Sequence, residues 1–207
     1  MKTMKNIVLG FGAIALLANC GGSGDANKPS SSANASAAEQ VYVPPGEHDE
    51  FYAFLSGGFS GQMTVYGLPS GRLFRRIPVF SQDAERGYGY DEETKPMLMT
   101  SEGFVPWDDS HHPELSQTDG VPDGRFIFIN GNNTPRIAKI DLTTFETTEI
   151  IEIPNCGGNH SSPFTTENTE YVVAGTRFSV PVPQKDMPIS EYKGNFKGNL
   201  SFVSVEK

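Results

Sequence analysis

Two adjacent histidines, His111 and His112, offer the most distinctive chemistry in this sequence. They lie between the carboxylates of Asp108 and Asp109 and the step Pro113-Glu114. Adjacent side chains leave an extended strand on opposite faces and diverge by about 100° on a helix. We therefore expect the two imidazoles to point in different directions, which suits two metal ions held side by side better than a single ion.

A third histidine stands in a second polar stretch. The chain has four histidines: besides the pair and His48 there is His160, which follows the sequence NCGGN of residues 155–159. Imidazole is a good ligand for zinc, copper, iron and nickel, so the residues favour a metal site without choosing the metal. The competing interpretations are a hydrogen-bonded polar surface loop for the histidines and an inert buried thiol for Cys156.

Length and composition favour a folded, β-rich protein. The 207 residues are 37% hydrophobic and 11% aromatic, which is enough for a packed core. Fifteen prolines and 22 glycines are typical of a chain with many turns rather than long helices. The formal net charge of −9 argues against binding to nucleic acid, which requires a basic surface.

The N-terminus predicts export. Lys2 and Lys5 precede an apolar run at residues 7–18. This run is shorter than the roughly 20 residues of a membrane span and fits a secretory signal. Residues 1–20 resemble a bacterial lipoprotein signal in which Cys20 is the lipidated residue, and the alternative is an ordinary cleaved signal.

A linker is expected to follow the signal. Residues 21–40 are rich in Gly, Ser and Ala and contain no large apolar side chain, so we interpret them as a flexible tether. The folded domain is then expected at residues 41–207. Once the signal is removed, Cys156 has no internal disulfide partner.

Short apolar runs separated by turn residues predict strands along the folded part, and no apolar period of 3.6 residues persists for three turns. Pro69-Ser70-Gly71 predicts the turn of a hairpin. The histidine stretches are interpreted as loops. The predicted strands are residues 51–55, 63–66, 73–79, 125–129, 136–142, 149–153, 171–174 and 200–205.

Two of these segments look like copies of one unit. Residues 65–79 align with residues 139–153, and a further copy begins at Phe202. Repeated four-stranded units are typical of β-propeller blades. Both histidine stretches fall between the repeated strand pairs, where loop insertions are expected. Because the third copy breaks off at Lys207 and a propeller needs about four to eight blades, we expect the N-terminal blades of a larger propeller.

A family resemblance rests on the histidine stretch. Residues 107–120 (WDDSHHPELSQTDG), continuing into residues 123–130 (DGRFIFIN), resemble the N-terminal propeller of nitrous-oxide reductases. His160 falls where that family places its next histidine ligand, and residues 174–183 and 192–194 are also similar. The resemblance extends from about residue 41 to residue 207.

The resemblance implies an all-β, seven-bladed propeller and an oxidoreductase that reduces nitrous oxide to dinitrogen and water. The chemistry takes place at a sulfide-bridged cluster of four coppers held by seven histidines. Three of those ligands are implied to be His111, His112 and His160. The groups expected to orient the imidazoles by accepting their second N–H are Asp108, Asp109 and Asn159.

Further implications concern the rest of the enzyme. Four ligands, and a C-terminal cupredoxin domain with a binuclear copper site, are expected outside this sequence, so the chain alone is expected to be inactive. The implied partners are an electron donor, such as a c-type cytochrome or a cupredoxin, and a second copy in a homodimer. The signal has no twin arginine, which predicts the Sec-exported, lipoprotein-type branch. The chain would then lie in the periplasm or cell envelope, with Cys20 as its lipid anchor.

Two other functions compete with this interpretation. A non-enzymatic, envelope-anchored propeller could use the histidine loops to recognise a protein or a glycan. A hydrolase with an Asp/His pair is less well supported, because the sequence has no Gly-x-Ser-x-Gly nucleophile elbow.

Overall fold

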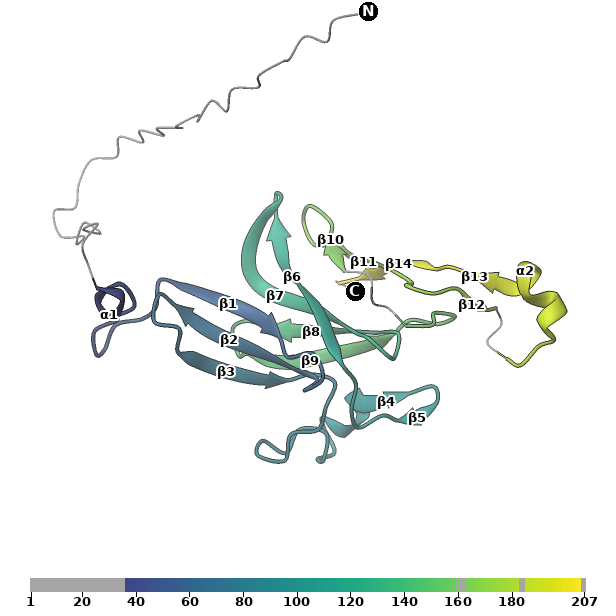
Figure 1. Cartoon of the computed structure of the whole chain (residues 1–207), viewed down its shortest axis with the longest axis horizontal. Coiled ribbons are helices and arrows are strands. Elements are labelled where there is room, and N and C mark those ends of the chain that lie inside the picture. Colours follow the sequence, from purple (N-terminus) through teal and green to yellow (C-terminus); the bar gives the residue numbers. More distant parts are fainter. Residues whose placement is uncertain (1–35, 159, 161–162, 183–184, 206–207) are drawn as a thin grey trace, which may run out of the picture.

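The computed structural model describes residues 36–158, 160, 163–182 and 185–205 (Figure 1). The predicted signal peptide, with Cys20, lies outside the described residues, as does the predicted linker up to residue 35. The last described residues of that linker form the one-turn helix α1 (Ala37–Gln40). Ser36 caps this helix: its hydroxyl accepts the backbone N–H of Glu39, whose carboxylate accepts the backbone N–H of Ser36.

Three antiparallel sheets follow one another along the chain and pack face to face. The first is a meander of β1 (Phe51–Ser56), β2 (Gln62–Leu68) and β3 (Leu73–Pro78). In β2 the side chains alternate between buried and partly buried, and Met63 and Val65 point into the core. Between β3 and the second sheet lie three short elements: η1 (Lys95–Leu98), β4 (Met99–Thr100) and β5 (Gly103–Phe104).

The second sheet occupies the middle of the stack. It is a four-stranded antiparallel meander of β6 (Ser110–Thr118), β7 (Val121–Gly131), β8 (Arg136–Asp141) and β9 (Glu146–Glu152), which is the composition of one propeller blade. Alternation along β7 buries both faces of this sheet. Ile127 and Ile129 join the core shared with the first sheet, whereas Phe128 joins the core shared with the third.

The third sheet contains β10 (Phe164–Thr165), β11 (Tyr171–Gly175) and β14 (Leu200–Ser204). Between β11 and β14 the chain makes an arm that extends away from the sheets in Figure 1. The arm pairs β12 (Val180–Pro181) with β13 (Phe196–Lys197), and its described part also holds η2 (Ile189–Glu191) and α2 (Tyr192–Asn195). Within the described ranges no helix is long and apolar enough to cross a bilayer.

The structure confirms the all-β prediction, with sheets arranged in the manner of propeller blades. The two aligned segments, residues 65–79 and 139–153, fall on the last two strands of the first and second sheets. Phe202 lies in β14, the last described strand of the third sheet. The prediction of a loop at the histidine pair is wrong, because His111 and His112 are part of strand β6.

Candidate metal centre

The adjacent histidines sit at a bulge near the start of β6. His111 pairs with Asn130 of β7, but the next regular pair is Glu114 with Phe128, so β6 has one residue more than its partner strand. Pro113 has no N–H for the ladder, and a bulge is one of the few sheet positions that accept a proline. His112 takes the left-handed conformation, with φ of 42°.

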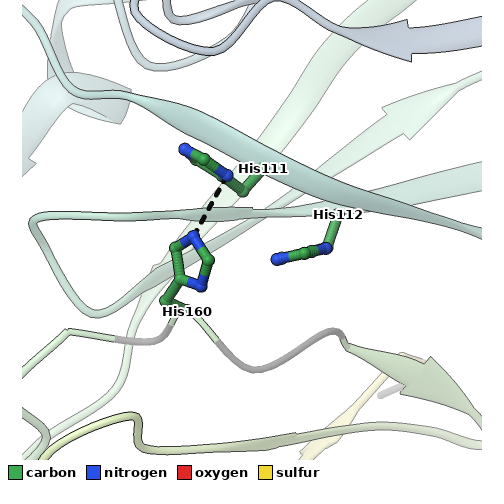
Figure 2. Close-up of side chains that lie close together, drawn as sticks. All are labelled: His111, His112 and His160. Atoms are coloured by element: carbon green, nitrogen blue, oxygen red, sulfur yellow. Dashed lines mark hydrogen bonds between the residues drawn. The ribbon is translucent and has the colours of Figure 1, made fainter.

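The bulge changes where the two imidazoles point. Their ring centroids are 5.6 Å apart, and both rings lie on the side of the strand that faces His160 (Figure 2). The expectation that the adjacent side chains point apart is therefore wrong. It assumed a regular strand or helix, whereas the extra residue and the positive φ of His112 turn both rings to one site.

His160 completes the group from the segment between β9 and β10. Its ring centroid lies 4.4 Å from that of His111 and 4.8 Å from that of His112. The Nε2 atom of His160 is 3.2 Å from Nδ1 of His111, as the dashed line in Figure 2 marks. One ligand nitrogen from each of the three residues lies within 4.8 Å of the others.

Asp109 fixes the orientation of His111. Its Oδ2 lies 2.9 Å from Nε2 of His111, and its side chain is only 4% exposed. A carboxylate only accepts hydrogen bonds, so the neutral imidazole donates from Nε2, and Nδ1 keeps its lone pair. The ring thus presents Nδ1 to His160.

The other two predicted orienting residues are placed differently. Asp108 is fully buried, and among the described residues no hydrogen bond joins it to the three imidazoles. Its carboxylate instead accepts the backbone N–H groups of Asn133 and Thr134, each at 3.0 Å, and pairs with Arg136 at 3.5 Å. Asn159 lies outside the described residues.

Burial sets the protonation of two nearby groups. The pKa of His112 is lowered mainly by burial and, to a smaller extent, by the neighbouring imidazoles of His160 and His111. The lowered pKa favours the neutral imidazole, which is the form that binds metals. Cys156 lies in the core between the second and third sheets, and burial raises the pKa of its thiol to about 11. The thiol is therefore protonated at neutral pH.

The three imidazoles fit a transition metal. For zinc, the metal–nitrogen distance is about 2.0–2.1 Å, so two nitrogens 3.2 Å apart can share one ion. Three imidazoles without a free carboxylate favour zinc, copper, iron or nickel over magnesium or calcium, which prefer oxygen. In the described part of the chain, His111, His112 and His160 are the residues of ligand type (His, Cys, Asp or Glu) that gather three ligand atoms within 4.8 Å of one another.

Asn132 belongs to the same surroundings, and sequence reasoning missed it. Its side-chain amide donates to Oδ2 of Asp109 at 3.1 Å. The polar run Asn132-Asn133-Thr134, directly after strand β7, marks a turn in the sequence. Nothing in that run identifies which carboxylate the turn will meet.

Comparison with known proteins identifies relatives of the chain. No protein-family profile matches it. It is 38% identical over 146 residues to nitrous-oxide reductase of Stutzerimonas stutzeri, covering 70% of this chain and 23% of that protein. It is 38% identical over 174 residues to nitrous-oxide reductase of Pseudomonas fluorescens, covering 83% of this chain and 27% of that protein. It is 35% identical over 181 residues to nitrous-oxide reductase of Cupriavidus necator, covering 82% of this chain and 28% of that protein.

Among solved structures, a chain of hydrazine synthase from Kuenenia stuttgartiensis is similar over 75% of this chain and 48% of that chain, with a TM-score of 0.40 and 12% identity. The chain spans about a quarter of the length of the curated relatives it matches. Over most of its own length, this chain is therefore related to the nitrous-oxide reductase family.

Proposed function

We propose that this chain contributes three imidazole ligands to the copper cluster of a nitrous-oxide reductase. The observation that carries the proposal is the convergence of His111, His112 and His160 from the second sheet and the segment that leads into the third. A histidine pair in a polar surface loop would not be expected to converge with a third imidazole from a distant segment. The relatives named as nitrous-oxide reductases supply the choice of copper and of substrate.

The protein's own residues prepare the site for metal. His111 offers Nδ1, because Nε2 is held by Asp109, which also makes the ring a better electron donor. Burial keeps His112 in the neutral form. When bound, the cluster held in part by His111, His112 and His160 would supply the two electrons that, with two protons, reduce nitrous oxide to dinitrogen and water. Asp109, which also accepts a hydrogen bond from the side-chain amide of Asn132, keeps the ring of His111 from turning.

The proposal extends to the whole enzyme. The remaining ligands and the copper site that receives electrons come from sequence outside this chain. The donor is a small redox protein, such as a c-type cytochrome or a cupredoxin, and the enzyme is a homodimer. Residues 1–20 direct export as a lipoprotein-type signal, residues 21–40 form the linker, and Cys20 anchors the protein in the periplasm or cell envelope.

The test is the copper content of the complete gene product, purified without oxygen from the cell envelope. We expect several coppers per chain and reduction of nitrous oxide, both lost in the double variant His111→Ala/His112→Ala. His48→Ala is the matched control, because it removes the exposed fourth histidine, which lies outside the cluster. A folded, copper-free protein from copper-replete cells would contradict the proposal and favour an envelope-anchored binding module.

A further inference from the structure

The turn at residues 132–134, between β7 and β8, contacts the segment that carries His111. We call it the clamp turn. Its residue Asn132 makes two hydrogen bonds to Asp109: the backbone N–H donates to the carbonyl oxygen at 2.9 Å, and the side-chain amide donates to Oδ2 at 3.1 Å. The same Oδ2 accepts from Nε2 of His111. The Asp109 carboxylate thus bridges the side chain of Asn132 and the imidazole of His111.

The clamp turn also touches the segment that carries His160. Gly158, two residues before that histidine, has φ of +84°, and a Cβ there would lie 3.2 Å from the carbonyl oxygen of Asn132. A side chain at this position would be strained by its backbone conformation and crowded by that oxygen. The glycine lets the chain pass directly against the clamp turn. Asn132 therefore lies against both histidine segments: it donates two hydrogen bonds to Asp109, and its carbonyl oxygen lies close to Gly158.

The clamp turn is itself held by a buried ion pair. The side chains of Asp108 and Arg136 are both 0% exposed. Asp108 accepts hydrogen bonds from the backbone and side chains of Asn133 and Thr134, and the guanidinium of Arg136 lies 5.1 Å from the centre of the Phe80 ring. A buried pair of this kind adds little net stability, but removing one partner would leave a buried charge uncompensated, which is costly.

We infer that Asn132 is a positioning residue that sets His111 against His160. The inference rests on the proposed function for its metal, whereas the geometry of the imidazoles can be measured without metal. The side-chain amide of Asn132 and Nε2 of His111 both donate to Oδ2 of Asp109. The other ring nitrogen of His111, Nδ1, lies 3.2 Å from Nε2 of His160. Loss of the hydrogen bond between Asn132 and Asp109 should therefore increase the distance between the rings of His111 and His160.

The test compares two asparagines of the clamp turn. Asn132→Ala removes the amide that binds Asp109, and the matched control Asn133→Ala removes the amide that binds Asp108. Each variant of the 207-residue chain loses one amide–carboxylate hydrogen bond from the same turn. Asn132→Asp is the second variant, because it keeps the shape of the side chain but replaces the donating amide by an acceptor.

Two measurements decide the outcome. The first is NMR of metal-free protein labelled with ¹⁵N in its histidines. We expect Asn132→Ala and Asn132→Asp to lose the protected Nε2–H signal of His111 and the ring contact between His111 and His160, while Asn133→Ala keeps both. The second is the affinity for Cu(I) alone against a competing chelator. We expect a loss of about tenfold in the Asn132 variants and less than about twofold in the control.

The results separate the positioning role from the proposed function. Unchanged histidine signals in both Asn132 variants, or equal losses in Asn133→Ala, would overturn the positioning role. If the wild-type chain binds no Cu(I) but the histidine signals respond as expected, Asn132 remains a positioning residue and the metal assignment fails. Unfolding temperatures of all variants show whether a change is local.

Discussion

His160 Nε2 lies 3.2 Å from His111 Nδ1, although 49 residues separate the two histidines in the chain. With Asp109 on the other nitrogen of His111, the three side chains form a hydrogen-bonded series that begins at a buried carboxylate. Asp109 fixes the donor atom of the central ring, and His160 donates to that ring's free nitrogen. The nitrogen that can bind a metal is therefore decided by a residue that is not itself a ligand.

Replacing that carboxylate should change the tautomer of His111. In Asp109→Asn the new amide can donate to Nε2, which favours the proton on Nδ1, the nitrogen that faces His160. We expect Cu(I) affinity to fall by about 10- to 100-fold and ¹⁵N spectra of histidine to show the tautomer exchanged. Asp119→Asn, in the exposed turn after β6, is the control. An unchanged tautomer would contradict the role of Asp109.

The arm is expected to support the segment that carries His160. A Cβ at Gly157 would lie 1.9 Å from Cγ1 of Val180 in β12, so Gly157→Ala should push that segment away. We expect lower thermal stability and loss of the ring contact between His111 and His160 in NMR spectra.

Val180→Ala should rescue this variant. Without the Val180 methyl groups, the nearest atom is the residue's Cβ, at 3.4 Å, an ordinary contact. The double variant Gly157→Ala/Val180→Ala should therefore be more stable than the sum of the two single changes predicts, with a coupling of about 0.5–3 kcal/mol in chemical unfolding. Additive effects would show that the arm does not press on Gly157.

The thiol of Cys156 should be unreactive in the folded chain. It is 2% exposed, and burial raises its pKa to about 11, so little thiolate forms at pH 8. We expect alkylation by iodoacetamide at least about 100-fold slower than in urea-unfolded protein, followed by mass spectrometry of the peptide that contains Cys156. Equal rates in folded and unfolded protein would mean that this core opens readily.

Asp123 should make stability depend on pH in the acid range. Burial opposes its charge, but hydrogen bonds from Ser116, Arg125 and Thr118 outweigh burial and hold the pKa of this carboxyl well below its usual range. Because the folded pKa is depressed, the stabilisation is complete above the unfolded pKa of about 3.9 and is lost as pH falls further.

Asp123→Asn tests this dependence. We expect the variant to melt below wild type at pH 7, and the difference to shrink steadily as pH falls below about 4. Asp186→Asn, at an exposed position of the arm, should melt like wild type throughout. A difference that stays constant down to pH 2 would show that the charge of Asp123 is not what stabilises the β6–β7 hairpin.

Most of the longer strands could be predicted from the sequence because their apolar residues alternate or cluster between clear turn signals, whereas β6, which carries the histidine pair, was predicted as a loop. Two features of the site could not be predicted. The φ of 42° at His112 depends on how β6 pairs with β7, and no local pattern specifies an extra residue in one strand. Asn132 meets Asp109 only because β7 runs back beside β6, a tertiary relationship that a polar turn sequence does not reveal. The approach of His160 to the pair was implied by family resemblance and not by spacing.

The bulge at His112 also bears on how the site assembles. Because it turns two neighbouring side chains to one side, a single hairpin already presents two of the three imidazoles once β6 and β7 have paired. Only one contact of large sequence separation, that of His160, then remains to be made. Docking of the segment that carries His160 against this hairpin then adds the third imidazole.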